Sequence, residues 1–385
     1  MKFIGEFVNE IEAKRSGLYS LFGLDERAGE IESALREQLD RRWHGLPAPG
    51  EAFDTEFSVD SSSASRSLCN GVDFFIIRAL MLGTGDYSRK SMQFEMVKGI
   101  RDSRVAVDFE RILRDLIEIT IVRDNLGDVP DGAAVLIDGN LYGRFTHLLR
   151  QLNLRGWEHL PLTLLDAMQR LFEDCVDRGI TLVGVSKFSK TRVLTTALLA
   201  ERGYRLADPD YLDVELLYRW RQGETGYTTP LMLGEYAIEK EALSGRDPRD
   251  YVSRYFPSIP QSRRGWAERV IDGVPSSPAV VMFHIIPKEN AQPMRVDIPA
   301  CSLGVTKKIS DVKPFEFTDP GLVEQVARQL VSDFGGRDVY NALLYIVDRE
   351  VRLGVSTVDR VYRSVLGREL GVPIEYDRST RRFTY

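Results

Sequence analysis

Acidic residues at the ends of apolar segments are the features of this sequence that could do chemistry. Asp60 closes a short alternating segment, Glu56–Asp60, and Asp138 closes an unbroken apolar segment, Ala133–Asp138, which Gly139 follows. A carboxylate at the end of a buried strand is costly to desolvate unless it is paired or holds a cation. Carboxylate oxygens suit Mg²⁺ and Mn²⁺, and two such ions can hold the attacking and leaving oxygens of a phosphodiester. These residues therefore lead to the hypothesis of a metal-dependent nuclease.

Two helical carboxylates extend this candidate site, and each also has an ordinary structural explanation. Glu118 lies on a predicted helix between the two aspartates, and Asp348 lies on a predicted helix near the end of the chain. Glu118 could instead form an ion pair on a solvated helix face with Arg114, four residues earlier, and Asp348 could do so with Arg352. Glu110 is a second candidate on the helix of Glu118, so the residues alone leave that choice open.

Basic residues supply candidate contacts to nucleic acid. Lys187 follows a third buried segment and precedes a predicted helix, a position where backbone N–H groups and a helix dipole bind phosphate. A pair of arginines beside Trp266 could clamp a single strand. Both basic groups could equally be solvated surface. The candidate DNA contacts are Lys187, Ser189, Lys190, Arg192, Arg263 and Arg264.

Composition narrows the class of protein. The chain has 385 residues, 43% hydrophobic and 28% charged, which is ordinary for a globular protein. The net charge of −6 does not suggest a protein that coats nucleic acid, although a local basic channel can exist on an acidic protein. No apolar run is long enough to span a membrane, and the start of the chain does not resemble a signal peptide. The three separated cysteines, Cys69, Cys175 and Cys301, fit reduced thiols, so we expect a cytoplasmic protein.

The order of the predicted elements favours a mixed α/β fold. A strand over Glu56–Asp60, a polar turn over Ser61–Ser67 and a strand over Val72–Leu82 predict a hairpin. Asp60 could simply cap that turn, and Asp138 could close an Asx-turn. The remaining expected strands are Ala133–Asp138, Ile180–Ser186, Val214–Trp220, Leu231–Ile238, Val280–Ile286 and Met294–Ile298, with a terminal hairpin over Ile374–Tyr385. The expected helices lie within residues 6–42, where Asp25 and Glu26 mark a start, and over Arg104–Asp124, Leu141–Leu152, Leu162–Arg178, Thr191–Arg202, Pro320–Phe334, Val339–Leu353 and Thr357–Leu366.

We expect a ribonuclease H-like mixed sheet flanked by helices, with N-terminal and C-terminal helical extensions. A Pro/Gly linker, residues 44–54, separates the first helices from the first strand. The predicted division is an N-terminal helical segment over residues 1–50, a nuclease domain over residues 51–355, and a C-terminal helix and tail over residues 356–385. Residues 240–278 are polar and helical in pattern and form an insertion in the middle part.

Several short motifs, in order, resemble those of the NurA nuclease family. Ser58–Ser62 is similar to the first strand motif of the family, of Val-Asp-Gly-Ser type, and Arg114–Glu118 looks like its Arg-x-x-x-Glu helix. Val135–Leu141 resembles its Leu-Asp-Gly-Ser-Leu motif, and Val183–Lys190 its Val-Gly-Val-x-Lys segment. Tyr340–Leu353 resembles its C-terminal helix, which contains Tyr-Pro and Ala-His. Together these motifs span residues 56–353.

The resemblance implies a set of functional properties. It selects Glu118 over Glu110 and implies a homodimer with two Mn²⁺ or Mg²⁺ ions at Asp60, Glu118, Asp138 and Asp348. It also implies 5′-to-3′ exonuclease and single-strand endonuclease activity on DNA. In the mechanism that we expect, Lys187 holds the scissile or an adjacent phosphate. The partner implied is the hexameric HerA ATPase, in the resection of double-strand breaks, and this partner would supply the ATPase that the chain itself lacks.

Departures from the family pattern keep other functions open. Ser61 and Asn341 stand where the family has Gly and Pro, and Asp348 stands where it has a metal-binding His. An all-carboxylate site shifts preference toward the harder Mg²⁺. The alternatives are a non-catalytic ribonuclease H-like module that binds DNA or a partner, and a phosphohydrolase that acts on small molecules.

Overall fold

The structure is a computed structural model that describes residues 3–15, 17–18, 29–187, 189–204, 211–235, 246–336 and 338–377. Parts of four predictions lie outside these residues. They are the helix start at Asp25 and Glu26, the end of the Leu231–Ile238 strand, residues 240–245 of the insertion, and residues 378–385 of the terminal hairpin.

A three-stranded antiparallel meander forms one side of the sheet. Strand β2 (Glu56–Ser67) pairs with β3 (Val72–Gly83), and β3 pairs with β4 (Ser88–Lys98). The predicted hairpin is confirmed, but the predicted turn at Ser61–Ser67 is wrong because β2 runs through it. The hydroxyls of Ser63 and Ser65 donate to Glu110 of a packed helix, and every residue of the run pairs with β3, so these polar residues can continue a strand. Strand β4 was missed, although Met92, Phe94 and Met96 alternate with polar residues as a strand requires.

Parallel strands continue the sheet from the other edge of β2. Strand β5 (Ala134–Asp138) lies parallel to β2 and to β6 (Thr181–Ser186). Beyond β6 the order is β10, β9, β7 and β1, with β8 joining β9 to β11. The predicted mixed sheet is confirmed. These remaining strands are β1 (Trp43–His44), β7 (Gly226–Thr228), β8 (Leu231–Leu233), β9 (Val280–Ile286), β10 (Met294–Pro299) and β11 (Phe315–Phe317).

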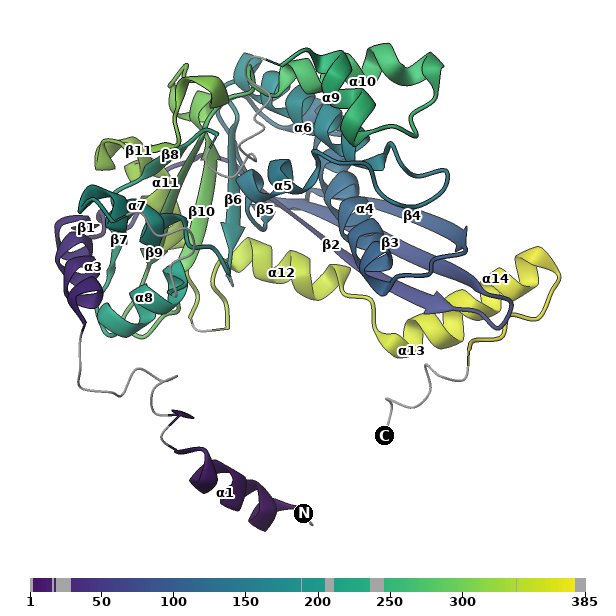
Figure 1. The fold of residues 1–385 in the computed structure, drawn as a ribbon, viewed down its shortest axis with the longest axis horizontal. Helices are drawn as coiled ribbons and strands as arrows, with labels where there is room; N and C mark the ends of the chain where they lie inside the picture. The colour runs from purple at the N-terminus through teal and green to yellow at the C-terminus, as the bar shows by residue number, and fades with distance from the viewer. Residues whose placement is uncertain are drawn as a thin grey trace.

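Helices cover both faces of the sheet (Figure 1), and their bounds mostly follow the predicted ones. Residues 213–220 are an exception, because the expected strand there is a helix whose Leu216, Leu217 and Trp220 share one face. The expected insertion contains two helices among its described residues. The helices are α1 (Ile4–Ala13), α3 (Glu30–Arg41), α4 (Ser103–Asp124), α5 (Leu141–His147), α6 (Leu160–Asp177), α7 (Val193–Glu201), α8 (Asp213–Trp220), α9 (Pro248–Tyr255), α10 (Gln261–Gly273), α11 (Glu324–Ser332), α12 (Ala342–Val351), α13 (Val355–Thr357) and α14 (Arg363–Leu370). Short turns of other helix types cover Leu126–Asp128, Ala300–Leu303, Ile309–Asp311, Pro320–Val323 and Val358–Tyr362.

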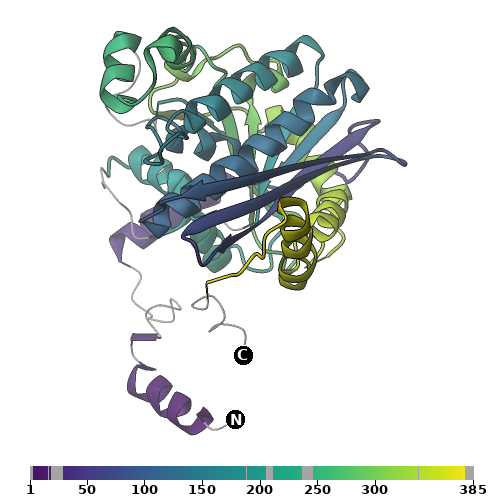
Figure 2. The same ribbon diagram turned by 90° about the vertical axis from the view of Figure 1, so that its right-hand side faces the viewer.

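Two helices that carry candidate site residues lie on opposite faces of the meander (Figure 2). Because side chains alternate along a strand, Ile77 of β3 packs in the same core as Phe109 of α4, while Leu80 packs with Val347 and Val351 of α12. The sheet therefore lies between α4 and α12, so side chains of both helices can approach the same strand from its two faces. No helix in the described part of the chain is long and apolar enough to cross a bilayer.

Candidate active site

Asp60 and Asp138 lie side by side on neighbouring parallel strands. In the register of β2 and β5, Val59 is opposite Ile137, so the next residue of each strand carries a carboxylate at the same level of the sheet. Asp60 is 4% exposed, and its Oδ1 accepts a hydrogen bond from the Ser61 backbone N–H at 2.7 Å. Alternating β2 and apolar β5 thus hold two acidic side chains at the same level of the sheet, as the sequence predicted for a pair of strands in one sheet.

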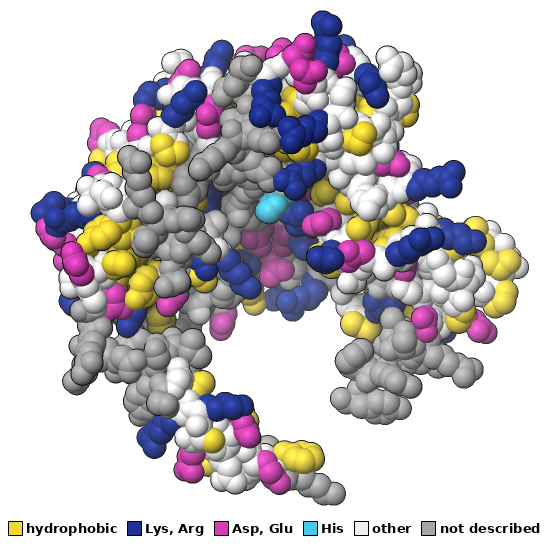
Figure 3. Space-filling view, viewed as in Figure 1, with side chains coloured by type: hydrophobic (Ala, Val, Ile, Leu, Met, Phe, Trp, Pro, Cys, Tyr) yellow, Lys and Arg dark blue, Asp and Glu magenta, His cyan; other side chains and the backbone are white. Residues whose placement is uncertain are grey.

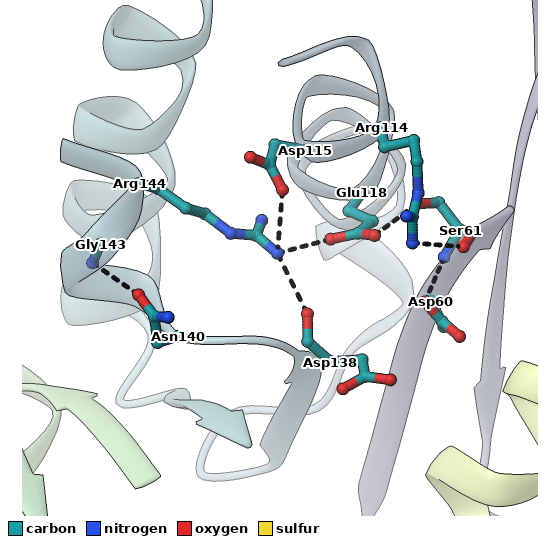
Figure 4. Close-up of polar contacts among 9 residues, drawn as sticks. All are labelled: Asp60, Ser61, Arg114, Asp115, Glu118, Asp138, Asn140, Gly143 and Arg144. Carbon is teal, nitrogen blue, oxygen red and sulfur yellow. Dashed lines mark hydrogen bonds and ion pairs between the residues drawn. The ribbon is translucent and has the colours of Figure 1, made fainter. Parts of the chain in front are cut away.

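Glu118 joins these aspartates from helix α4 (Figure 4). It is 2% exposed, and both of its oxygens have donors. The Ser61 hydroxyl donates to Oε1, and Arg144 Nη2 donates to Oε2 at 2.7 Å. Arg114 donates to the hydroxyl and the carbonyl of Ser61, at 3.2 and 2.9 Å. The explanation of Glu118 as half of a solvated pair with Arg114 is therefore wrong.

Glu110, the other candidate on α4, has a different role. It accepts hydrogen bonds from the hydroxyls of Ser63 and Ser65, the latter at 2.9 Å. These contacts fasten α4 to the polar half of β2, further along the strand than Asp60. Glu110 therefore accounts for the serine run and leaves Glu118 as the carboxylate beside Asp60.

Arg144 of α5 is a central residue that the sequence analysis missed. It is 8% exposed and its Nη2 also lies 3.4 Å from Asp115 and 3.1 Å from the Asp138 carbonyl oxygen. Burial alone would lower the pKa of Arg144, but the carboxylates of Asp115 and Glu118 raise it above its ordinary value. Asn140 caps α5 by accepting from the Gly143 N–H at 2.7 Å. That cap, visible in the sequence, starts the helix that carries Arg144 back toward the cluster.

Lys187, Tyr340 and Asp348 complete the other side of the site. Lys187 Nζ lies 3.4 Å from Asp138 Oδ2 and 3.9 Å from Asp348 Oδ2. The same ammonium stands 3.8 Å from the centre of the Tyr340 ring, and the Tyr340 hydroxyl donates to Asp138 at 3.4 Å. Asp348 thus approaches the site on α12, and Tyr340, which the sequence analysis used only as a motif residue, contacts it directly.

The acidic cluster, formed by Asp60, Glu118 and Asp138, concentrates negative charge in a largely buried part of the protein. Burial, and then the charges of Glu118 and Asp138, raise the pKa of Asp60 to about 8. Burial also raises the pKa of Asp138, although Lys187 opposes this shift. A bound cation would relieve the same repulsion. The all-oxygen donor set fits a hard divalent metal ion in its chemistry.

The arrangement of the donors is not yet that of a closed metal site. Within the described ranges, no three His, Cys, Asp or Glu side chains already surround a point where an ion could bind. Lys187 and Arg144 occupy part of the space around the carboxylates and supply positive charge there. The carboxylate side chains would therefore have to turn toward a common point for an ion to bind among them.

The remaining predicted DNA contacts lie in two separate places, the turn between β6 and α7 and helix α10. Lys190 is exposed and Arg192 is partly exposed in the turn between β6 and α7. Ser189 is 3% exposed and shares a hydrogen bond with the Thr191 hydroxyl at 2.9 Å, so its own hydroxyl faces the protein. Arg263 and Arg264 lie on α10, and no contact among the described residues joins them to the carboxylate cluster.

An antiparallel meander continued by two parallel strands, with carboxylates on adjacent strands, is the ribonuclease H-like arrangement predicted from the sequence. The NurA nuclease from Sulfolobus solfataricus shares this fold with a TM-score of 0.61 and 14% identity, over 96% of this chain and 98% of that one. A structure of NurA with manganese has a TM-score of 0.53 and 12% identity, over 94% and 98% of the two chains. A structure of NurA bound to dAMP and manganese has a TM-score of 0.51 and 10% identity, over 95% and 96%.

The NurA domain family model matches residues 54–352 of this chain. The chain belongs to the NurA family, as its motifs indicated. No curated protein sequence matches it closely enough to count as a relative.

Proposed function

We propose that this protein is a metal-dependent DNA nuclease. The observation that carries the proposal is the register of β2 and β5, which sets the carboxylates of buried Asp60 and partly buried Asp138 side by side, with buried Glu118 of α4 near them. Similar folds have been solved with manganese and with dAMP bound. Phosphodiester hydrolysis is the chemistry that such an acidic cluster supports when divalent ions neutralise it.

Each side chain of the site has a separate part in this proposal. Asp60 and Asp138 would hold the metal, and Glu118 and Asp348 would complete its ligands. Two bound Mn²⁺ or Mg²⁺ ions would supply a coordinated water of lowered pKa and stabilisation of the leaving oxygen. Lys187, whose ammonium lies 3.4 Å from the Asp138 carboxylate, would hold the phosphate that is cleaved.

The family resemblance supports further parts of the proposal. They are 5′-to-3′ exonuclease and single-strand endonuclease activity, a homodimer in the cytoplasm, and joint action with the hexameric HerA ATPase in the resection of double-strand breaks. The chain itself carries no P-loop. A separate ATPase must therefore supply any work that requires ATP hydrolysis.

The test is cleavage of end-labelled single- and double-stranded linear DNA in Mn²⁺, Mg²⁺ or EDTA. Helix α4 offers a matched pair of variants, Glu118→Gln and Glu110→Gln, which remove the same charge at two points of one helix. We expect Glu118→Gln to slow cleavage by about a hundredfold or more. Glu110→Gln should stay close to the wild type, because its partners are two serines of β2.

The same assay separates the proposal from the alternative of a non-catalytic binding module. A module of that kind would give no metal-dependent products from the wild-type chain, alone or with the hexameric partner. Equal loss in both glutamate variants would also refute the assignment, because it would reflect damage to α4 and not to a metal ligand.

A further inference from the structure

A pocket of about 260 Å³ opens beside the acidic cluster, between helices α4 and α5. Arg111 and Arg114 line it from α4, Arg144 and His147 line it from α5, and Asp138 lies at its inner end. Arg111 and Arg114 are three residues apart, as are Arg144 and His147, so each helix presents both residues on one side. The pocket therefore connects the carboxylates to a basic wall that no part of the proposed mechanism uses.

The charge in this pocket changes from its inner to its outer end. Buried Glu118 and partly buried Asp138 are the deeper acidic lining residues, whereas half-buried Arg111 and exposed His147 are at the outer end. Figure 3 shows the corresponding hollow at the centre of one face, where Lys and Arg side chains stand around Asp and Glu side chains. A surface lined by cations therefore lies next to the point where the phosphodiester would be cleaved.

The outer cations are available to a ligand. Arg111 has an ion pair with Asp108 at 3.0 Å, but both side chains are substantially exposed, 38% and 51%. An exposed pair on one helix contributes little and is easily exchanged for another anion. Burial lowers the pKa of His147, and the charge of nearby Arg111 lowers it further. A neutral imidazole can still donate a hydrogen bond to a phosphate oxygen.

A deeper group of the pocket also lacks a partner. Arg144 Nη2 is engaged by Glu118 and Asp115, but its other terminal nitrogen, Nη1, has no hydrogen-bond partner in the described part of the chain. A buried donor left in this state is costly. Arg144 lines the pocket, so a small shift toward a ligand oxygen would satisfy this donor.

We propose that the pocket between α4 and α5 binds a backbone phosphate of DNA, adjacent in the same strand to the phosphate that is cleaved. Arg111 and His147 contact the phosphate oxygens, and Arg144 forms the cationic floor. The subsite rests on the proposed nuclease function, because that function places a DNA strand at Asp60 and Asp138. It would fix the path of the strand across the carboxylates without reading its sequence.

The experiment measures binding separately from cleavage. The full-length Asp60→Asn chain provides a background without cleavage, because Asp60 is a proposed metal ligand. This substitution leaves the pocket intact, because Asp60 does not line it. A short labelled single strand is titrated by fluorescence anisotropy in Mn²⁺ at several salt concentrations, with and without Arg111→Gln and His147→Gln together. The matched control is Arg104→Gln, which removes one charge from the first turn of the same helix, where the side chain is 89% exposed.

With both pocket substitutions, we expect about tenfold weaker binding and a salt slope smaller by about one, because one charged phosphate contact is lost. The control should bind like its parent. An unchanged affinity and salt slope in the double variant would overturn the subsite. In the wild-type background, the same double variant should raise KM and preserve kcat, whereas a fall in kcat alone would also overturn it. Absence of cleavage by the wild type would refute the nuclease while leaving the binding result to decide the subsite.

Discussion

Removal of Arg144 provides a quantitative test of how the acidic cluster is held together. Arg144→Ala deletes a guanidinium whose side chain is 7% exposed, next to Glu118 at 3% and Asp115 at 19%. Leaving buried charges without their partner costs about 3–5 kcal/mol. Glu118 keeps the Ser61 hydroxyl as a donor, so we expect the lower end, a loss of about 3 kcal/mol in the free energy of unfolding.

The loss should depend on pH with a definite sign. Burial raises the pKa of Asp115, and Arg144 is the largest influence that opposes this rise. Without Arg144 the folded-state pKa rises further above the unfolded value, so the folded state binds more protons. The destabilisation should therefore be largest above that raised pKa and should shrink on acidification, as the Asp115 carboxyl becomes protonated.

The assay is urea denaturation of the metal-free chain at pH 8 and pH 5, with two comparison variants. Arg144→Lys keeps the charge but not the forked geometry and should be intermediate. Arg170→Ala removes an exposed i,i+4 pair with Asp166 and should cost less than about 1 kcal/mol. An Arg144→Ala loss no greater than that of Arg170→Ala, or one that grows on acidification, would refute the reasoning.

Three further outcomes follow from the same geometry. Because burial and neighbouring carboxylates raise the pKa of Asp60 to about 8 from an ordinary value of 3.8, the metal-free chain should lose stability as pH rises between these values. Asp60→Asn should flatten this pH dependence of stability and stabilise the chain at pH 9 in EDTA, measured by thermal unfolding. A steeper pH dependence in the variant would contradict the direction of the Asp60 pKa shift. Lys187→Ala should lower kcat by about a hundredfold or more and change the free energy of unfolding by less than about 1 kcal/mol relative to the wild type. Single-turnover cleavage measures this rate, and an unchanged rate would contradict the role of Lys187. Asp348→His should raise the ratio of cleavage in Mn²⁺ to cleavage in Mg²⁺, because imidazole is a softer ligand, and an unchanged ratio would remove Asp348 from the metal site.

The sequence by itself determined β5, which ends at Asp138, and the first half of β2, up to Asp60. Ala134–Ile137 is apolar throughout because β5 is covered on both faces and lies between two parallel neighbours. The polar residue that ends such a run lies at the carboxyl end of the strand, so Asp138 could be placed there without any tertiary information. Local signals also set the helix that bears Glu118, since Asp102 caps α4 and its apolar residues repeat with helical spacing.

Only the tertiary structure decided which charged groups meet there. Tyr340 reaches Asp138 across a separation of 202 residues, and Arg144 reaches Glu118 across 26. No periodicity encodes such contacts, because they depend on how α5 and α12 pack against the sheet. The serine run shows the same limit: its composition favours a turn, but hydroxyl contacts to Glu110 keep it in β2. Local patterns fix where carboxylates stand along the chain, whereas burial and the partners brought by packing fix their charge.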